Sequence, residues 1–431
     1  MKKDLFFAAV FAACAAQICA TPYEPATENL KARREFAEMR LGVFLHWGLY
    51  ALHGQGEWYQ SSKDIDRLEY AKLKDCFNPV KFDARKWARA FREAGVKYVT
   101  FTSRHHEGFS MFATKENDYN VTASPYGRDI VRELGDAVRA EGMKFHLYYS
   151  LVDWHLDEYP LGDCPNKKGW DQSKADYGKY HTFMMNQLSE LLANYGPIGA
   201  IWFDGEWDHA PKTKFDWRFR ELYDRIHEIQ PACLVGNNHH HDLIEGEDFQ
   251  MIENTVREGQ RLDPAFPLET CETMNGHWGY AMGDLCYKSV DQLVELLVRN
   301  AARGANLLIN IGPQPNGELP ELACERLAGL GAWLKTYGDT IYGTNAGQEF
   351  PERDVVATTK GSVVYLHFLD PRRTAFSFAV AGKVASVAEY PSGTRAAFTQ
   401  TQDGVLVFAP KTNGSRPDTV YAVEIRREEL R

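Results

Sequence analysis

The strongest constraint on the fold of this chain is a repeated unit in which an amphipathic helical pattern precedes a short apolar run. In one clear unit, the helical pattern of residues 85–94 ends at Gly95 and a β-rich run follows at 96–102. Glycine often ends helices because it reaches the left-handed conformation at little cost. Further helical patterns lie at 130–141, 180–195, 215–229 and 290–302, and further strand patterns at 43–46, 145–150, 200–203, 233–236 and 306–311.

Alternating strands and helices predict a parallel sheet built from β/α units. The number of units favours an α/β fold with a (β/α)8-like TIM barrel over an open doubly wound sheet. No G-x-G-x-x-G motif follows the first strand, which disfavours a dinucleotide-binding domain.

The pattern changes after a helix predicted at residues 320–337. Short alternating runs such as VVYLHFL, FSFAV and GVLVFAP follow, separated by turn residues. This pattern predicts a small antiparallel β-sandwich. We therefore expect two domains after the first twenty residues, a catalytic barrel at 21–343 and a C-terminal β-sandwich at 344–431.

The first twenty residues have the features of a secretory signal peptide. Two lysines precede an apolar run, and Ala20 precedes a polar stretch. We expect cleavage after Ala20 and export to the periplasm or the medium, with a lipid anchor at Cys14 or Cys19 as the alternative. No later segment approaches 18 uninterrupted apolar residues, so no membrane span is predicted.

Composition excludes several classes of partner and cofactor. The formal net charge is -10, whereas nucleic-acid-binding proteins carry a basic surface. The sequence also has no basic tract that would bind an anionic membrane. The six cysteines after residue 20 form no CxxC pair, which argues against thiolate metal binding. One or two disulfides remain open, and no pairing follows from the sequence.

Polar and aromatic residues mark the ends of four successive predicted strands. VFLHWG ends with His46, YVTFTSRHHEGF continues into His105 and His106, HLYYSLVDW is rich in tyrosine, and AIWFDGEW contains Asp204. Catalytic groups of a β/α barrel lie at the C-terminal ends of its strands. We therefore expect one active site at this end of the barrel.

Carboxylates, histidines and indoles around one cavity favour glycoside hydrolysis. A retaining glycosidase uses one carboxylate as the nucleophile and a second as the acid/base. Histidine and tyrosine can hydrogen-bond the hydroxyls of a sugar, and tryptophan can pack against its apolar face. The substrate class that these residues predict is a carbohydrate.

Metal catalysis is the competing interpretation of the histidines. Adjacent side chains on an extended strand point to opposite faces, so His105 and His106 are not expected to bind one ion together. The run NNHHHD at residues 237–242 has no H-E-x-x-H spacing. We expect His239–His241 to be solvated and to contribute at most to a subsite, and we predict neither a metal nor a cofactor.

Several of these motifs together resemble glycoside hydrolase family 29, the α-L-fucosidases. The resemblance spans about residues 40–313 and rests on RLGVFLHWGLYAL with GEWY, FNPVKFDARKWARAFREAGVKYVTFTSRHHEGFSMF, LYYSLVDWH, IWFDGE and LLINIGPQPNG, in the order of the family. It implies an exo-acting, retaining enzyme that releases terminal α-L-fucose from fucosylated glycans.

The resemblance also implies roles for individual residues. Asp204 corresponds to the nucleophile of the family. LETCETMNGHWGY resembles the block that carries the acid/base and selects Glu269, with Glu272 and Glu57 as alternatives, while Glu206 is expected to support other residues. The residues implied to bind the substrate, with Trp202 packing against the 6-methyl group of fucose, are His46, Glu57, Trp58, His105, His106, Tyr148, Trp202 and Arg257.

Two other functions remain open at the level of the sequence. One is hydrolysis of a configurationally related sugar such as a β-galactoside, and the other is fucose binding by a barrel without catalytic activity. The fucosyl linkage, the aglycone and the oligomeric state do not follow from the residues.

Overall fold

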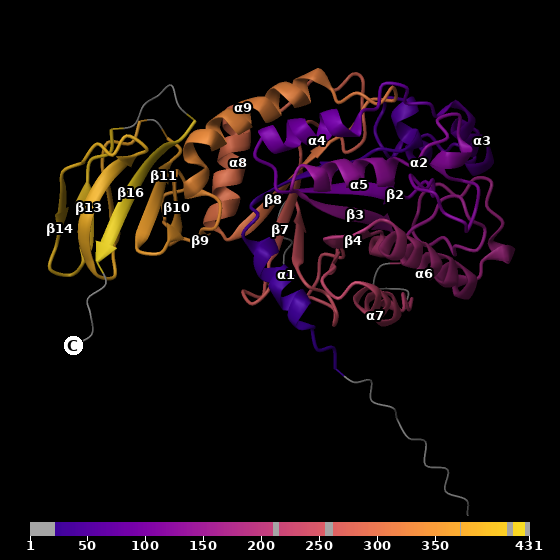
Figure 1. The fold of residues 1–431 in the computed structure, drawn as a ribbon, viewed down its shortest axis with the longest axis horizontal. Helices are drawn as coiled ribbons and strands as arrows, with labels where there is room; N and C mark the ends of the chain where they lie inside the picture. The colour runs from indigo at the N-terminus through magenta and orange to yellow at the C-terminus, as the bar shows by residue number, and fades with distance from the viewer. Residues whose placement is uncertain (1–21, 210–214, 255–261, 371, 412–416, 427–431) are drawn as a thin grey trace, which may run out of the picture.

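The computed structural model describes residues 22–209, 215–254, 262–370, 372–411 and 417–426. The predicted signal peptide lies outside the described residues. The main body is an eight-stranded parallel sheet curved into a near-closed barrel, with helices around it (Figure 1). Its strands are β1 (Leu41–Leu45), β2 (Tyr98–Arg104), β3 (Lys144–Ser150), β4 (Ala200–Asp204), β5 (Leu234–Asn237), β6 (Gln250–Glu253), β7 (Leu268–Thr273) and β8 (Ala305–Ile311).

The strands follow the order β5-β4-β3-β2-β1-β8-β7-β6, so β1 pairs with β8 and closes most of the barrel. This architecture confirms the predicted TIM-like barrel. The surrounding helices are α1 (Thr27–Ala37), α2 (Tyr59–Ser62), α3 (Arg67–Ala71), α4 (Ala84–Glu93), α5 (Ile130–Ala140), α6 (Tyr177–Asn194), α7 (Phe219–Ile229), α8 (Val290–Ala302) and α9 (Glu321–Tyr337).

Local signals explain where the main helices begin and end. The side chains of Asp83 and Asp129 accept backbone N–H groups at the starts of α4 and α5. Gly95 and Gly142, with φ values of 87° and 78°, follow α4 and α5 in the left-handed conformation. Helix α7 begins at Phe219 instead of the predicted residue 215, because Arg218 has a φ of 54° and interrupts the helical backbone.

Five elements of the barrel are absent from the sequence-based prediction: α1, α2, α3, β6 and β7. The segment between β5 and β6, residues 238–249, is fully described and contains no helix. The helix–glycine–strand rhythm therefore does not extend to β6, which explains why the periodic pattern misses it.

Strands β5 and β6 form no hydrogen-bonded ladder with each other, and side chains bridge the seam between them. Asp248, two residues before β6, donates its N–H to the Val235 carbonyl at 2.7 Å and accepts the Val235 N–H on its carboxylate at 2.8 Å. Arg33 of α1 donates to the same carboxylate at 2.6 Å. Helix α1 thus fastens the open side of the barrel.

The C-terminal part packs against α8 and α9 as two antiparallel sheets (Figure 1). The five-stranded sheet has the order β13-β16-β11-β10-β9, and the three-stranded sheet the order β12-β15-β14. These sheets confirm the predicted antiparallel β-sandwich. Their strands are β9 (Asn345–Ala346), β10 (Val355–Lys360), β11 (Val363–Phe368), β12 (Phe376–Ala379), β13 (Lys383–Tyr390), β14 (Phe398–Gln400), β15 (Val405–Phe408) and β16 (Thr419–Arg426).

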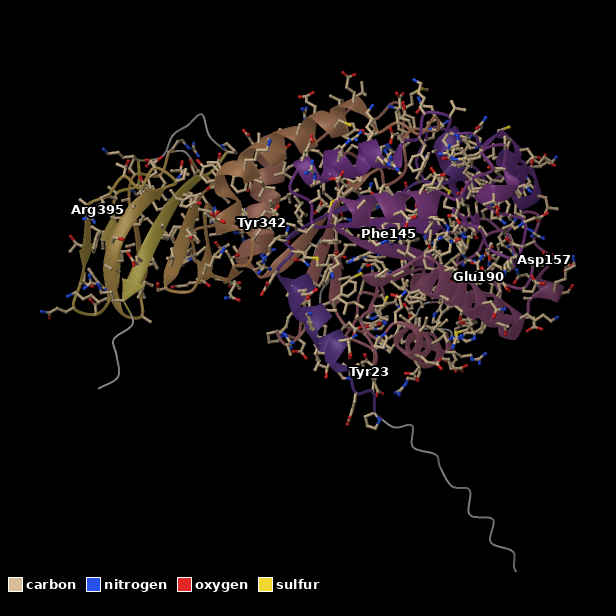
Figure 2. All side chains as sticks on the ribbon, in the orientation of Figure 1. Tyr23, Phe145, Asp157, Glu190, Tyr342 and Arg395 are labelled. Carbon is tan, nitrogen blue, oxygen red and sulfur yellow. The ribbon has the colours of Figure 1, made fainter. Side chains whose placement is uncertain are left out.

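Specific contacts join the sheets to the barrel. Tyr342 lies at the junction (Figure 2) and donates its hydroxyl to the Gly95 carbonyl at 2.6 Å. Thr358 of β10 donates to the Thr340 carbonyl at 2.6 Å. Among the described residues, all six cysteines are free thiols and no helix is long and apolar enough to cross a membrane.

Candidate active site

A cavity of about 260 Å³ opens at the C-terminal ends of the barrel strands. Its walls come from strands β1, β3, β4 and β6 and from the loops after β1, β2, β4, β5 and β7, so residues far apart in the sequence meet there. The lining residues are Phe44, His46, Glu57, Trp58, His105, His106, Tyr148, Trp202, Asp204, Trp207, Asn238, His240, Glu253 and Trp278.

Asp204 is the last residue of β4, and its carboxylate reaches the cavity. The Tyr148 hydroxyl donates to Oδ2 at 3.0 Å, and the Gly205 N–H donates to Oδ1 at 2.8 Å. Burial raises the pKa of Asp204 to about 7, and the charge of Glu253 adds to this rise. Gly205 has a φ of 107°, and a Cβ there would lie 2.6 Å from Val152, so the turn that presents Asp204 needs glycine.

Glu253 is the last residue of β6 and lies beside Asp204. Asn238 donates its side-chain amide to Glu253 Oε2 at 2.8 Å and lies 3.5 Å from Asp204 Oδ1. The amide thus bridges the two carboxylates across the open seam between β5 and β6. The cavity therefore holds two neighbouring carboxylates, from the ends of β4 and β6.

Glu57 is a third carboxylate on the cavity wall. It accepts the Gly279 N–H at 2.7 Å, and burial raises the pKa of its carboxyl group. The neighbouring Trp58 is 37% exposed and its ring centroid lies 5.3 Å from that of Trp207. This indole pair forms part of the mouth of the cavity.

All three strand-end histidines predicted from the sequence line the cavity. The expectation that His105 and His106 point to opposite faces is wrong, since β2 ends at Arg104 and both residues belong to the turn after it. Their ring centroids lie 4.2 Å apart. Burial lowers the pKa of His46 and of His106 to about 3, and that of His105 well below its ordinary value. His46 and His106 are therefore neutral at pH 7.

Trp202 lines the cavity with its ring and donates its indole N–H away from it, to Glu269 Oε1 at 2.9 Å. The Tyr98 hydroxyl donates to Glu269 Oε2 at 2.5 Å. Glu269 is 1% exposed and is not among the lining residues. Burial raises its pKa to about 7, opposed by these two hydrogen bonds. The structure therefore places Glu269 inside the barrel, behind Trp202.

Two further glutamates considered from the sequence, Glu272 and Glu206, are not among the residues that line the cavity. Glu272 is 3.5 Å from the Lys288 ammonium group, and Glu206 is 3.9 Å from His241 Nε2. Arg257 lies outside the described residues. In the NNHHHD run, His239 faces Glu247 at 3.0 Å, whereas His240 reaches the cavity.

The sequence reasoning misses five lining residues, Phe44, Trp207, Asn238, Glu253 and Trp278. A barrel of eight strands requires one between residues 237 and 268, and FQMIE was the segment with strand-like residues followed by an acid. Placing β6 there would have identified Glu253 as a strand-end carboxylate. In the described parts of the chain, no group of three or more His, Cys, Asp or Glu residues is arranged to hold a metal ion.

A β/α barrel with carboxylates, histidines and indoles around one sugar-sized cavity at its strand ends has the arrangement of a glycoside hydrolase. A family model described as Alpha-L-fucosidase matches residues 10–339. The chain belongs to this family, glycoside hydrolase family 29, and is a hydrolase of the α-L-fucosidase type.

Named relatives agree with this family. The tissue alpha-L-fucosidase of Rattus norvegicus is 31% identical over 377 residues, covering 81% of this chain and 79% of its own. That of Homo sapiens is 29% identical over 385 residues, covering 81% and 78%. Among solved structures, alpha-L-fucosidase isoenzyme 1 from Paenibacillus thiaminolyticus superposes with a TM-score of 0.84 at 32% identity, covering 93% of this chain and 100% of its own.

Proposed function

We propose that this protein is an exo-acting, retaining α-L-fucosidase that releases terminal L-fucose from fucosylated glycans by double displacement. The observation that carries the proposal is the pair of cavity carboxylates, Asp204 and Glu253, joined by the Asn238 amide. A related alpha-L-fucosidase from Bacteroides thetaiotaomicron, with a TM-score of 0.80 at 26% identity and covering 92% of this chain and 96% of its own, has been described as a trapped covalent intermediate. Such an intermediate is what double displacement requires.

In this mechanism Asp204 attacks the anomeric carbon while Glu253 protonates the leaving oxygen, and Glu253 then removes a proton from the attacking water. We assign the acid/base role to Glu253 in place of Glu269, because Glu253 lines the cavity and Glu269 does not. Glu57, which also lines the cavity, is the alternative acid/base.

The sugar is held by the other lining residues in this proposal. His46, His105, His106 and Glu57 face the ring hydroxyls, and Tyr148 holds Asp204 in place through its hydroxyl. The Trp202 ring and the indole of Trp58 supply apolar surface, which suits the 6-methyl group of a deoxy sugar. Burying a methyl group of this kind is worth roughly 1 kcal/mol. Arg257 remains a proposed contact on the family resemblance alone.

The proposal is tested by assaying the purified protein on nitrophenyl α-L-fucoside, nitrophenyl β-D-galactoside and a panel of fucosylated oligosaccharides. We expect turnover of the fucosides. NMR spectra recorded during the reaction should show that the fucose is released first as the α anomer. Turnover of the galactoside alone would favour the related-sugar hydrolase, and binding of fucose without turnover would favour a non-catalytic barrel. Fucose released first as the β anomer would exclude double displacement.

We also propose that the protein is exported to the periplasm or the medium. The support is the pattern of the first twenty residues, with its lysines, apolar run and Ala20. Mass spectrometry of the protein recovered after expression should find Thr21 at the N-terminus. An N-terminal lipid-modified cysteine would instead indicate a membrane anchor.

A further inference from the structure

Two of the cavity histidines are held from behind by neutral side chains whose own hydrogen bonds fix the positions of the protons. His46 contacts Asn310 of β8, and His106 contacts Ser150 of β3. All four residues are at most 4% exposed, so each polar atom depends on these partners. The proton on each imidazole can therefore be deduced by elimination.

The proton on His46 follows from the orientation of Asn310. The Asn310 amide nitrogen lies 2.7 Å from the Trp278 carbonyl oxygen, to which only an N–H can donate. The amide oxygen of Asn310 is therefore the atom that faces His46, and it lies 2.7 Å from Nδ1. Because that oxygen can only accept, Nδ1 of His46 carries the proton.

The proton on His106 follows from the hydroxyl of Ser150. This hydroxyl donates its single proton to the Val152 carbonyl oxygen at 2.7 Å. It also accepts the Val152 N–H at 3.0 Å. It also lies 2.7 Å from Nδ1 of His106 and has only a lone pair left for that contact. Nδ1 of His106 must therefore donate.

Each ring is neutral, because burial lowers the pKa of both histidines to about 3, so a proton on Nδ1 leaves Nε2 as a bare acceptor. Nε2 of His106 lies 3.5 Å from Asp204 Oδ2. With Asp204 ionised for attack, these two acceptors cannot hydrogen-bond each other. A hydroxyl group of the ligand would supply the missing proton.

We propose that Asn310 and Ser150 are positioning residues that fix His46 and His106 as Nδ1–H tautomers, so that both rings recognise the sugar by accepting protons from its hydroxyl groups. The identity of the sugar as L-fucose rests on the proposed function. The tautomers themselves do not depend on it. A site of this polarity rejects a group that can accept but not donate, even when its size matches a hydroxyl.

The tautomers are tested by NMR on protein labelled with ¹⁵N in histidine, without any ligand. The signals of the two rings are assigned by comparison with the variants His46→Gln and His106→Gln. We expect a protonated Nδ1 and an unprotonated Nε2 for each ring at pH 7. A proton on Nε2 of either ring would overturn the proposal.

Recognition is tested with L-fucose and its 2-, 3- and 4-deoxy and deoxyfluoro analogues as competitive inhibitors. Fluorine can accept a hydrogen bond weakly but cannot donate one. At two of the three positions, we expect the fluoro analogue to bind as poorly as the deoxy analogue, each about tenfold more weakly than L-fucose. Fluoro analogues that bind within about twofold of L-fucose at every position would overturn the proposal.

The variant Ser150→Ala removes the acceptor that holds Nδ1 of His106. His106 can then carry its proton on Nε2 and donate it to fluorine. We therefore expect the fluoro analogue at one position to bind about threefold better than the deoxy analogue. Ser103→Ala is the matched control, because it removes a buried hydroxyl that donates to the Tyr148 carbonyl and not to either histidine. The same change of ratio in both variants would overturn the role of Ser150. If L-fucose neither binds nor is released from any substrate, the proposed function fails, while the NMR spectra still decide the tautomers.

Discussion

Strands β6 and β7 lie side by side in the barrel, and each contributes one glutamate near the cavity, but the two carboxylates have opposite surroundings. Glu253 pairs in register with Cys271, and Glu269 pairs with Met251, so Glu269 lies two residues deeper in the barrel. Glu253 reaches the cavity and shares an amide with Asp204. Glu269 is sealed behind Trp202.

This difference in depth is the basis for proposing a chemical role for Glu253 and a structural role for Glu269. A proton donor must reach the leaving oxygen, directly or through one water. Both carboxylate oxygens of Glu269 accept buried donors, Tyr98 and Trp202, and we propose that Glu269 orients the indole that lines the cavity. Glu253 accepts the Asn238 amide on Oε2 and lies on the cavity wall, where a substrate can reach it.

The largest loss of activity should come from replacing Asp204, the carboxylate beside Glu253. Asp204→Ala removes the proposed nucleophile, and we expect kcat to fall by at least about 10⁴-fold on activated and unactivated fucosides alike. Added azide should then give the β-fucosyl azide, with inverted configuration. Turnover within tenfold of the unmodified protein would contradict the assignment of Asp204.

Glu253→Gln should separate Glu253 from Glu269 most directly. Because general acid catalysis matters most for a poor leaving group, we expect kcat/KM to fall about 10³-fold on a fucosylated disaccharide and far less on nitrophenyl fucoside. Azide should accelerate Glu253→Gly and give the α-fucosyl azide. Glu57→Gln is the matched control from the same cavity wall and should lower kcat/KM on both substrates by a similar factor. If the leaving-group dependence appears in Glu57→Gln instead, Glu57 is the acid/base.

Glu269→Ala should lower stability more than catalysis. The substitution leaves the buried Tyr98 hydroxyl and Trp202 indole without an acceptor, at a cost of about 2 to 5 kcal/mol in the free energy of unfolding. Urea denaturation measures this loss, and kcat of the folded variant should stay within about tenfold on both substrates. A leaving-group dependence like that of Glu253→Gln would return the acid/base role to Glu269.

The pH dependence of stability should also reveal the buried carboxyl group of Glu269. Its pKa is raised from 4.5 to about 7, so the folded protein binds this proton more tightly than the unfolded chain does. The resulting stabilisation is complete below pH 4.5 and is lost as the pH rises through about 7. We expect the free energy of unfolding to fall by about 2 to 3 kcal/mol more between pH 4.5 and 8 in the unmodified protein than in Glu269→Gln. Parallel urea-denaturation curves across this range would contradict the role of burial.

Much of the barrel could be predicted because its helices end at glycines and its strands form apolar runs. Helix α8 was predicted with the observed bounds, and the strand-end rule brought His46, His105, His106 and Asp204 to the cavity. Strand β6 was not predicted, because no helix directly precedes it and it is only four residues long. Missing β6 also hid Glu253 and the role of Asn238.

Spacing along the chain could not assign the acid/base. Glu269 and Glu272 both lie in the block LETCETMNGHWGY. The neighbouring residues in the sequence predict neither how deep each side chain lies in the barrel nor which groups it contacts. Tyr98, which bonds Glu269, lies 171 residues away on β2. Only the folded barrel brings these groups together, so the burial of Glu269 and the position of Glu253 on the cavity wall could not be predicted from the sequence.

The smallest effect should come from Glu272, the third glutamate of this region. It lies 3.5 Å from the Lys288 ammonium group, and the two side chains are 18% and 27% exposed. A partly solvated ion pair of this kind contributes about 0 to 1 kcal/mol. Glu272→Gln should therefore change the free energy of unfolding by less than about 1 kcal/mol, measured by urea denaturation, and kcat/KM on the disaccharide by less than about twofold. Since Glu272 shares strand β7 with Glu269 but lacks its buried donors, a loss of stability as large as that of Glu269→Ala would show that the strand, and not the sealed carboxylate, is what the Glu269 variant disturbs.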